Sequence, residues 1–194
     1  SLNKPAVCNL SWGMHTGPHD GTSLFDIALE DIINTPNPNS QKATGRALVG
    51  ANGNSAQHEM HIKLELNGDS AATLAMDRSR NNFKTENVYC DFWSELNSNL
   101  QFQIVLIDSQ DNVLIETPYW DFSKDTLISG KLVNNKDTFE ILLSGTRAYP
   151  YNGKSNFLMM LEANSNKRFI KINFRGKGEV HGWNSGRTYE WTAG

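Results

Sequence analysis

Histidine is the first residue type to weigh for metal binding or acid–base chemistry. His15 and His19 are four positions apart, which suits a helix face, but they lie in a segment rich in Gly and Pro where that spacing has no fixed geometry. His58 and His61 are three apart on an expected strand, which directs their side chains to opposite faces. We therefore predict no metal site, with a loop site of His15, His19 and Cys8 as the alternative.

Acidic and Asn-rich segments offer oxygen ligands of the kind that calcium prefers. They occur at Asp20, at Asn67–Asp69 and at Asp108–Asn112. None has the spacing of a dedicated calcium loop, and Asp and Asn are also the residues that form tight turns without an ion. We expect no cofactor, with bound calcium as the alternative.

Catalytic chemistry has weaker support. No Ser or Cys lies in the strand, turn and helix context that exposes a nucleophile. Paired carboxylates for glycoside cleavage follow no spacing rule that a sequence shows, and several Glu residues lie on expected strands. We expect a protein that is not an enzyme, with a hydrolase as the alternative. The Glu residues are Glu140, Glu162, Glu179 and Glu190.

Aromatic residues beside polar ones are the stronger candidates for a site. A loop at 184–187 would pair Trp183 with Thr188 and His181 with Glu190 in a last hairpin. An indole can stack on the C–H groups of a sugar while polar side chains hydrogen-bond its hydroxyls. The alternative is a Trp packed against a neighbouring strand. The predicted ligand-binding residues are Trp183, His181, Glu190, Asn184 and Arg187.

Two further groups of aromatic residues form a predicted secondary ligand-binding site, since loops at the ends of sandwiches often carry ligand contacts. A basic stretch at 167–177 could meet nucleic acid, but lysines on an edge strand more often prevent aggregation, so we expect no nucleic-acid partner. The secondary residues are Tyr119, Trp120, Asp121, Tyr149 and Tyr151.

The composition fits one folded domain over residues 1–194. The chain has 38% hydrophobic and 20% charged residues, which is enough for a sizeable core and too apolar for general disorder. The net charge of −3 gives no strong attraction to nucleic acid or to anionic lipid.

The elements that must position these residues are short strands, because alternating apolar and polar runs are separated by Asn, Gly, Asp and Ser turns. Turns at 109–112, 134–137 and 164–167 suggest consecutive hairpins, whereas the crossover helices of a parallel sheet are not expected. The expected strands are 6–12, 45–51, 57–67, 71–77, 87–94, 100–108, 113–120, 126–133, 138–145, 157–163, 168–175, 178–183 and 188–193.

We therefore predict an all-β fold, an antiparallel β-sandwich of Greek-key or jelly-roll type with at most one short helix. The first strand, from Ala6 to Trp12, should face the core. Residues 23–33 are ambiguous: Ser23 followed by Asp26 resembles a helix cap, but the all-β surroundings favour a strand.

The two cysteines, Cys8 and Cys90, fit either buried thiols or one disulfide. The sequence begins Ser-Leu-Asn, so we expect any signal peptide to have been removed or to lie outside it. The expected location is extracellular, secreted or at the surface of a cell or particle.

Two short segments are similar to motifs of the aegerolysins, which are small β-sandwich proteins that bind membrane lipids. They are Asn9–Gly13 together with His15, and Tyr89–Trp93. The resemblance leaves the last third of the chain unmatched. It implies membrane-lipid recognition, with Trp12 and Trp93 as the residues involved.

The function that these observations favour is non-catalytic, lectin-like recognition of carbohydrate. The first alternative is a membrane-lipid-binding toxin or pore-forming, cytolysin-like component. The second is a structural jelly roll of the capsid or tail type, which would form a symmetric oligomer. The expected partner is a glycan or a membrane surface, with a second copy of the chain, in a homo-oligomer, as a further candidate.

Overall fold

The structure is a computed structural model, and it describes residues 5–11, 13–36, 45–51, 53, 59–76, 86–108, 110–134, 137–163, 169–184 and 189–192. Whereas the sequence suggested one domain, the contacts divide the chain into two compact units, Ser1–Gln57 and His58–Gly194. Each unit is described by itself below.

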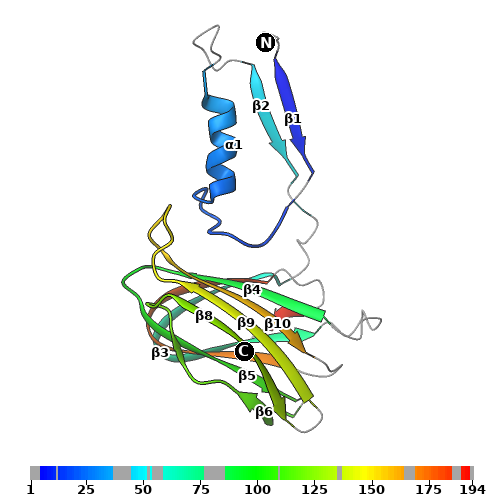
Figure 1. Cartoon of the computed structure of the whole chain (residues 1–194), viewed down its shortest axis with the longest axis vertical. Helices are drawn as coiled ribbons and strands as arrows, with labels where there is room; N and C mark the ends of the chain where they lie inside the picture. The colour runs from blue at the N-terminus through cyan, green and yellow to red at the C-terminus, as the bar shows by residue number, and fades with distance from the viewer. Residues whose placement is uncertain are drawn as a thin grey trace. The chain divides into compact units, whose positions relative to one another are not determined.

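The first unit is a strand–helix–strand arrangement. It consists of β1 (Ala6–Leu10), α1 (Leu24–Asn34) and β2 (Arg46–Gly50). The two strands are parallel, with Cα partners running from Ala6 and Arg46 to Leu10 and Gly50. A parallel pair needs a crossover connection, and α1 lies in it (Figure 1). The sequence-based expectation that the chain has no such crossover is wrong for this unit.

Residues 24–34 form a helix, so the preference for a strand over 23–33 is wrong. The backbone N–H of Asp26 donates to Oγ of Ser23 at 3.0 Å, and the Ser23 hydroxyl donates to Oδ2 of Asp26 at 2.6 Å. At the other end, the N–H of Thr35 donates to the carbonyl of Asp31 at 2.8 Å. The cap satisfies donors that a helix start leaves open, and this local effect outweighs the β character of the neighbouring segments.

The prediction that the first strand faces the core is also wrong. Ala6, Val7, Cys8 and Asn9 are all exposed, and Val7 keeps 72% of its surface accessible. Trp12, the last residue of the predicted strand, lies outside the described residues. The alternation in this segment correctly indicated an extended backbone, but it did not determine whether the apolar side chains would be buried.

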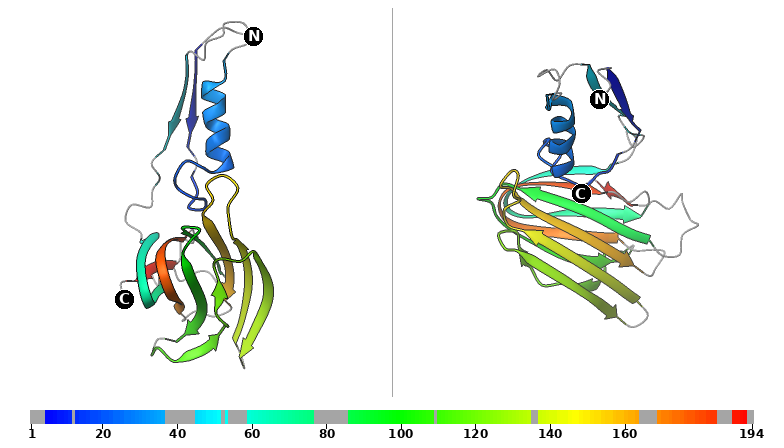
Figure 2. Two further views of the ribbon diagram at one scale, coloured as in Figure 1. Left: turned by 90° about the vertical axis from the view of Figure 1, so that its left-hand side faces the viewer. Right: turned by 45° about the horizontal axis from the view of Figure 1, so that its top comes forward.

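The second unit is a curled antiparallel sheet, so the predicted all-β sandwich-like fold is confirmed (Figure 2). Its hydrogen-bonded order is β12-β3-β11-β4-β10-β9-β8, and β5 pairs with β11, β6 and β7. Its strands are β3 (His61–Met76), β4 (Glu86–Ser94), β5 (Asn99–Ile107), β6 (Val113–Glu116), β7 (Trp120–Asp121), β8 (Thr126–Asn134), β9 (Asp137–Thr146), β10 (Ser155–Ala163), β11 (Phe169–Asn184) and β12 (Tyr189–Thr192).

The long strand β11 joins the two layers of this unit. Its residues 169–177 pair with β5 and its residues 180–184 pair with β4, while β3 follows it along the other edge. The change of partner coincides with Gly176 and Gly178, whose φ angles are 118° and 146°. The two strands predicted at 168–175 and 178–183 are therefore one bent strand. The two strands predicted at 57–67 and 71–77 are likewise one strand, β3 (His61–Met76), which passes through Gly68; residues 57, 58 and 77 lie outside the described residues.

The predicted hairpins are correct where the strands are neighbours in sequence and in the sheet. β5 pairs antiparallel with β6, and β8 pairs antiparallel with β9, as predicted from the segments 109–112 and 134–137; Ser109, Asn135 and Lys136 lie outside the described residues. The segment 164–167 lies outside the described residues, and it joins β10 to β11, which are separated by β4 in the sheet. The predicted strand at 113–120 is divided into β6 and β7.

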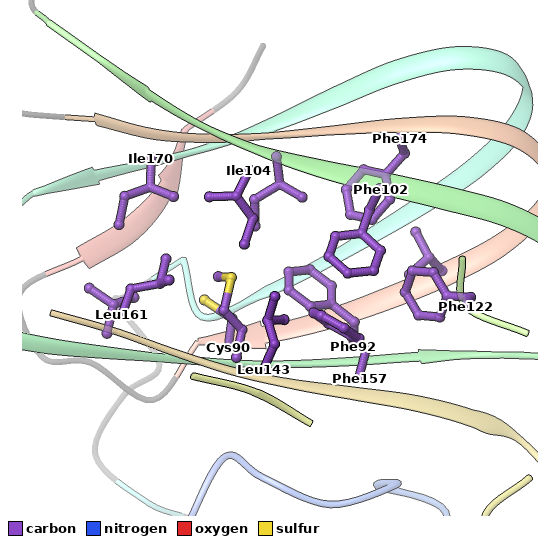
Figure 3. Close-up of a cluster of buried hydrophobic side chains, with 14 of the residues drawn as sticks. Cys90, Phe92, Phe102, Ile104, Phe122, Leu143, Phe157, Leu161, Ile170 and Phe174 are labelled. Carbon is purple, nitrogen blue, oxygen red and sulfur yellow. The ribbon is translucent and has the colours of Figure 1, made fainter. Parts of the chain in front are cut away.

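The core fills the space between the layers (Figure 3). Aromatic side chains form its centre: the rings of Phe102 and Phe157 lie 3.9 Å apart, and those of Phe92 and Phe174 lie 5.7 Å apart. Cys90 lies in this core and Cys8 is exposed in the first unit, and both are free thiols. The disulfide is therefore wrong, and the alternative of buried thiols is correct for Cys90 but wrong for Cys8. Other fully buried residues are Val88, Leu100, Leu143, Met159, Leu161, Ile170, Ile172 and Val180.

Two of the acidic segments considered for calcium form turns. Oδ1 of Asp108 accepts the N–H groups of Gln110 and Asn112 at 2.8 and 2.9 Å. Oδ1 of Asp20 accepts both the N–H and the hydroxyl of Thr22. In the part of the chain that the structure describes, no helix has the length and apolar character needed to cross a membrane.

Candidate functional site

The best-defined polar cluster lies on the outer face of β3 and β11. Their register places Trp183 opposite His61 and His181 opposite Lys63. Because side chains alternate along a strand, these residues and Glu179 share the face opposite to the buried Val180. We call His61, Lys63, Glu179, His181 and Trp183 the imidazole–indole cluster.

The three rings of the cluster are stacked in a compact triangle. The ring centroids of His61 and Trp183 are 4.6 Å apart, those of His61 and His181 are 5.2 Å apart, and those of His181 and Trp183 are 5.6 Å apart. The interplanar angles are 25°, 13° and 14° in the same order. The short distance between the two histidines means that they do not lie on opposite faces of the indole. Trp183 thus packs against a ring of the neighbouring strand, which was the alternative to sugar stacking.

A chain of polar contacts links the same residues. Nε2 of His61 lies 3.0 Å from Nδ1 of His181, and Nε2 of His181 lies 2.8 Å from Oε1 of Glu179. The other carboxylate oxygen of Glu179 is 2.7 Å from Nζ of Lys63. A carboxylate only accepts, so Nε2 of neutral His181 carries the proton and Nδ1 presents its lone pair to His61.

These contacts shift two pKa values. The hydrogen bond from Lys63, followed by that from His181, lowers the pKa of the Glu179 carboxyl. The pKa of the Lys63 ammonium is raised by its hydrogen bonds to Glu179 and to Glu65, which lies 3.2 Å away. Both shifts favour the charged forms, so the carboxylate that orients His181 stays ionised at neutral pH.

The structure brings together only part of the predicted primary site. Trp183 and His181 are in the cluster, but Asn184 is fully buried, and its backbone N–H donates to the carbonyl of Met60. The predicted last hairpin is wrong, because β12 pairs with β3 and not with β11. Glu190 is therefore opposite Ala75 instead of His181. Arg187 lies outside the described residues, as does His58.

Sequence reasoning missed the contributions of His61, Lys63 and Glu179 to this cluster. The polar alternation at 61–65 was a usable signal that one face of this strand is exposed. Glu179 could have been found by the same alternation, because it lies two residues before His181 on one strand. The proximity of His61 and Lys63 to His181 could not be found in this way, because β3 and β11 are far apart in the sequence and their pairing follows no local spacing rule.

The predicted secondary residues separate into two places. At the first, the guanidinium of Arg175 lies 3.9 Å from the ring centroid of Tyr119, and its Nε donates to Oε1 of Gln101 at 2.7 Å. Beside it, Nδ2 of Asn173 donates to Oε1 of Gln103 at 3.0 Å. We call Gln101, Gln103, Tyr119, Asn173 and Arg175 the Arg175 surface.

The neighbours of Tyr119 have mainly structural contacts. Trp120 is half-buried, with its ring centroid 5.5 Å from that of Phe102 in the core. Asp121 closes a turn: its Oδ1 accepts the N–H and the hydroxyl of Ser123 at 2.8 and 2.7 Å. Burial opposes ionisation of Asp121, but the hydrogen bonds from Ser123 and the charge of Lys124 outweigh it and lower the pKa of the carboxyl.

The other secondary residues belong to the loop between β9 and β10. The ring centroids of Tyr149 and Tyr151 are 5.6 Å apart, and the rings of Tyr149 and Trp93 form a T-shaped pair with centroids 5.1 Å apart. Trp93, which the aegerolysin resemblance implicates in lipid binding, is buried. Its companion in that resemblance, Trp12, lies outside the described residues.

Comparison with known proteins gives a fold relationship. No protein-family model and no curated protein matches the sequence. The solved structure of the Clostridium perfringens CspB protease is similar to this chain, with 15% sequence identity and a TM-score of 0.72. The similarity covers 99% of this chain and 38% of that chain, so this chain spans less than half the length of the protein that it resembles.

Proposed function

We propose that this chain is a segment of a longer protein of the protease kind, in which residues 58–194 form a non-catalytic binding domain. The observation that carries the proposal is the similarity to the CspB protease, which extends over 99% of the chain and therefore includes both units. The similar region is 38% of that protease, which leaves room for a separate catalytic part.

The surface of the first unit supports this proposal. Parallel sheets are normally covered on both faces, and a pair of strands with one helix buries little apolar surface. Within this unit Val7, Leu24, Phe25, Ile32 and Val49 are all exposed. Further strands and helices of a larger α/β domain would cover these side chains, which favours a unit that is part of such a domain.

The same arrangement suggests where the catalytic part would lie. In open α/β sheets, ligands bind beyond the carboxyl ends of the parallel strands. Here those ends are Leu10 in β1 and Gly50 in β2. In the second unit, Cys90 is a core residue whose thiol pKa is raised well above the ordinary value by burial and then by Asp91. Such a thiol is no nucleophile.

Hydrolysis of fluorescein-labelled casein tests the enzymatic part of the proposal. The complete polypeptide that the gene encodes should release fluorescent peptides, whereas residues 1–194 alone should not. A heat-unfolded sample of the complete polypeptide is the control for spontaneous release. A folded complete polypeptide that leaves casein and a mixed peptide library intact would overturn the assignment to the protease kind.

A second candidate function is carbohydrate recognition by the β-sandwich. The observation that favours it is the Arg175 surface, where the guanidinium lies over one face of the Tyr119 ring and planar amide groups lie nearby on β5 and β11. Such groups hydrogen-bond sugar hydroxyls while an aromatic ring packs on the C–H groups. Trp183 remains a second candidate contact.

A glycan array, probed with and without calcium, tests carbohydrate recognition. Tyr119→Ala or Trp183→Ala should weaken a selective signal by about 1 to 3 kcal/mol if the ring is a stacking anchor. Lys131→Ala on β8 is the control, because its exposed ion pair with Glu140 belongs to neither group of residues. A blank array would contradict this function. Binding to sugar-free vesicles would then favour lipid docking, and a stable symmetric oligomer would favour a structural role.

A further inference from the structure

His61 and His181 direct two ring nitrogens at each other across the β3–β11 pair. Nε2 of His61 is 3.0 Å from Nδ1 of His181. We propose that these two nitrogens bind a divalent transition-metal ion of the Zn²⁺, Ni²⁺ or Cu²⁺ class. Imidazole nitrogens suit these ions, whereas Ca²⁺ and Mg²⁺ prefer oxygen ligands.

Metal binding needs a change of tautomer and a small movement. Because Nδ1 of His181 accepts, Nε2 of His61 carries the hydrogen of the observed contact. That proton passes to solvent while Nδ1 of His61 takes one up, so that Nε2 presents a lone pair to the ion. Two imidazole nitrogens that bind one tetrahedral zinc ion at about 2.0 to 2.1 Å lie about 3.3 Å from each other. The observed separation of 3.0 Å is therefore a few tenths of an ångström short. His61 is exposed and His181 is half-buried, so the His61 ring can open the pair for an ion by a small movement within its own plane, which keeps its stacking on Trp183.

The surroundings of His181 match those of a metal-binding histidine. Such a histidine usually donates its other ring N–H to a carboxylate, which fixes the tautomer and the orientation of the ring. Here Oε1 of Glu179 accepts from Nε2 of His181 at 2.8 Å. Lys63 holds the other oxygen of that carboxylate at 2.7 Å. The lone pair of Nδ1 is thus directed away from Glu179 and toward His61.

The other ligand is also held in place. The ring of His61 stacks on Trp183 with a centroid distance of 4.6 Å and an interplanar angle of 25°. Stacking limits the rotation of the ring and keeps its Nε2 near His181. Two protein ligands leave the remaining coordination positions to water or to a donor from a bound molecule, so we expect weaker binding than at a structural zinc site.

Titration of the whole chain with Zn²⁺ by isothermal calorimetry tests the proposal. His61→Gln and His181→Gln should each weaken binding at least tenfold, and Glu179→Gln should weaken it about tenfold to a hundredfold by releasing the ring of His181. Zn²⁺ should raise the midpoint of thermal unfolding of the unchanged chain, since it binds only the folded form of the site. Mg²⁺ at the same concentration should neither bind detectably nor raise this midpoint.

His19→Gln is the matched control, because it removes a histidine from the other histidine pair in the chain. The variants are at surface positions, and circular dichroism verifies that each is folded. Zinc affinity that is equal in the unchanged chain, His61→Gln and His181→Gln would overturn the proposal. So would an unchanged chain that binds no Zn²⁺ at millimolar concentration, or a loss of binding in His19→Gln alone.

Discussion

Glu179 shows how much a single side chain organises on this surface. One carboxylate oxygen fixes His181 and the other holds Lys63, so the residue connects β11 to β3 through side chains as well as through the backbone. Both partners favour its ionised form, which is why the pKa of its carboxyl is lowered. The contacts of Glu179 with His181 and Lys63 therefore depend on pH, because they need the ionised carboxylate.

The stabilising effect of Glu179 should disappear in acid. A carboxyl whose pKa is lower in the folded chain stabilises the fold above its unfolded pKa of about 4.3, and this contribution is lost as the pH falls through the lowered value. Glu179→Gln should therefore lower the urea midpoint slightly at pH 7, and the difference from the unchanged chain should vanish once the pH lies below the lowered pKa of Glu179. A difference that stays constant over this range would contradict the assignment.

The two thiols should differ strongly in reactivity. Cys8 is exposed, whereas Cys90 is fully buried, and burial followed by the charge of Asp91 raises the pKa of its thiol well above the ordinary value. Since the thiolate is the reactive form, a disulfide-exchange reagent should label Cys8 rapidly and Cys90 only after unfolding. Cys8→Ser is the control and should abolish the rapid phase. Rapid labelling of both thiols in the folded chain would contradict the buried position of Cys90.

At the scale of elements, the bend in β11 determines the architecture of the second unit. The strand leaves β5 and continues beside β4, which lets one strand contribute Ile172 and Phe174 to one layer and Val180 to the other. Gly176 lies where the strand bends, with a φ of 118°. A Cβ atom there would lie 1.9 Å from the carbonyl oxygen of Asn99.

Gly176→Ala should therefore destabilise the second unit by at least about 2 kcal/mol, because it adds a clash with backbone to an unfavourable φ. Gly130→Ala in β8 is the matched control: a Cβ there meets no atom within 4 Å, and alanine in a strand is neutral or stabilising by up to about 1 kcal/mol. Urea unfolding followed by circular dichroism measures both. Equal stability of the two variants would contradict a strained bend at Gly176.

At the scale of the whole chain, the two units differ in how they bury apolar surface. Residues of the second unit such as Phe92, Phe102 and Phe157 are almost fully buried between layers. In the first unit, no residue of α1 is buried, and the apolar Val7 and Val49 are exposed on its strands. Local stability depends largely on buried apolar contacts, so the units should not be equally stable in this chain.

Amide hydrogen exchange of the chain should resolve this difference. Backbone amides of β1, α1 and β2 should exchange at least about a hundredfold faster than those of β4 and β10, because opening the first unit exposes little additional apolar surface. Exchange detected by mass spectrometry after proteolysis gives both rates in one sample. Equal protection of the two units would contradict this expectation and would show that the exposed side chains of the first unit are covered in solution.

Local sequence features predicted the positions of the secondary-structure elements better than they predicted how these elements pair. Period-two alternation located most strands, and the turn at Asp108 joined β5 to β6 as predicted. The cap at Ser23 correctly indicated a helix. The prediction of a strand was wrong because the β-rich neighbouring segments do not determine the local backbone of residues 24–34. The strands, the turn at Asp108 and the helix cap depend on residues close in sequence, so the sequence could predict them.

The tertiary structure alone decided which of these elements meet. His61 joins His181 and Trp183 because β3 pairs with β11, while β12, which follows β11 directly in the sequence, pairs with β3 instead. The buried position of Asn184 and the bend at Gly176 depend on the same pairings. Pairing between distant strands is selected by the burial of whole faces and not by local spacing, so the sequence determined the strands and the packing determined the site.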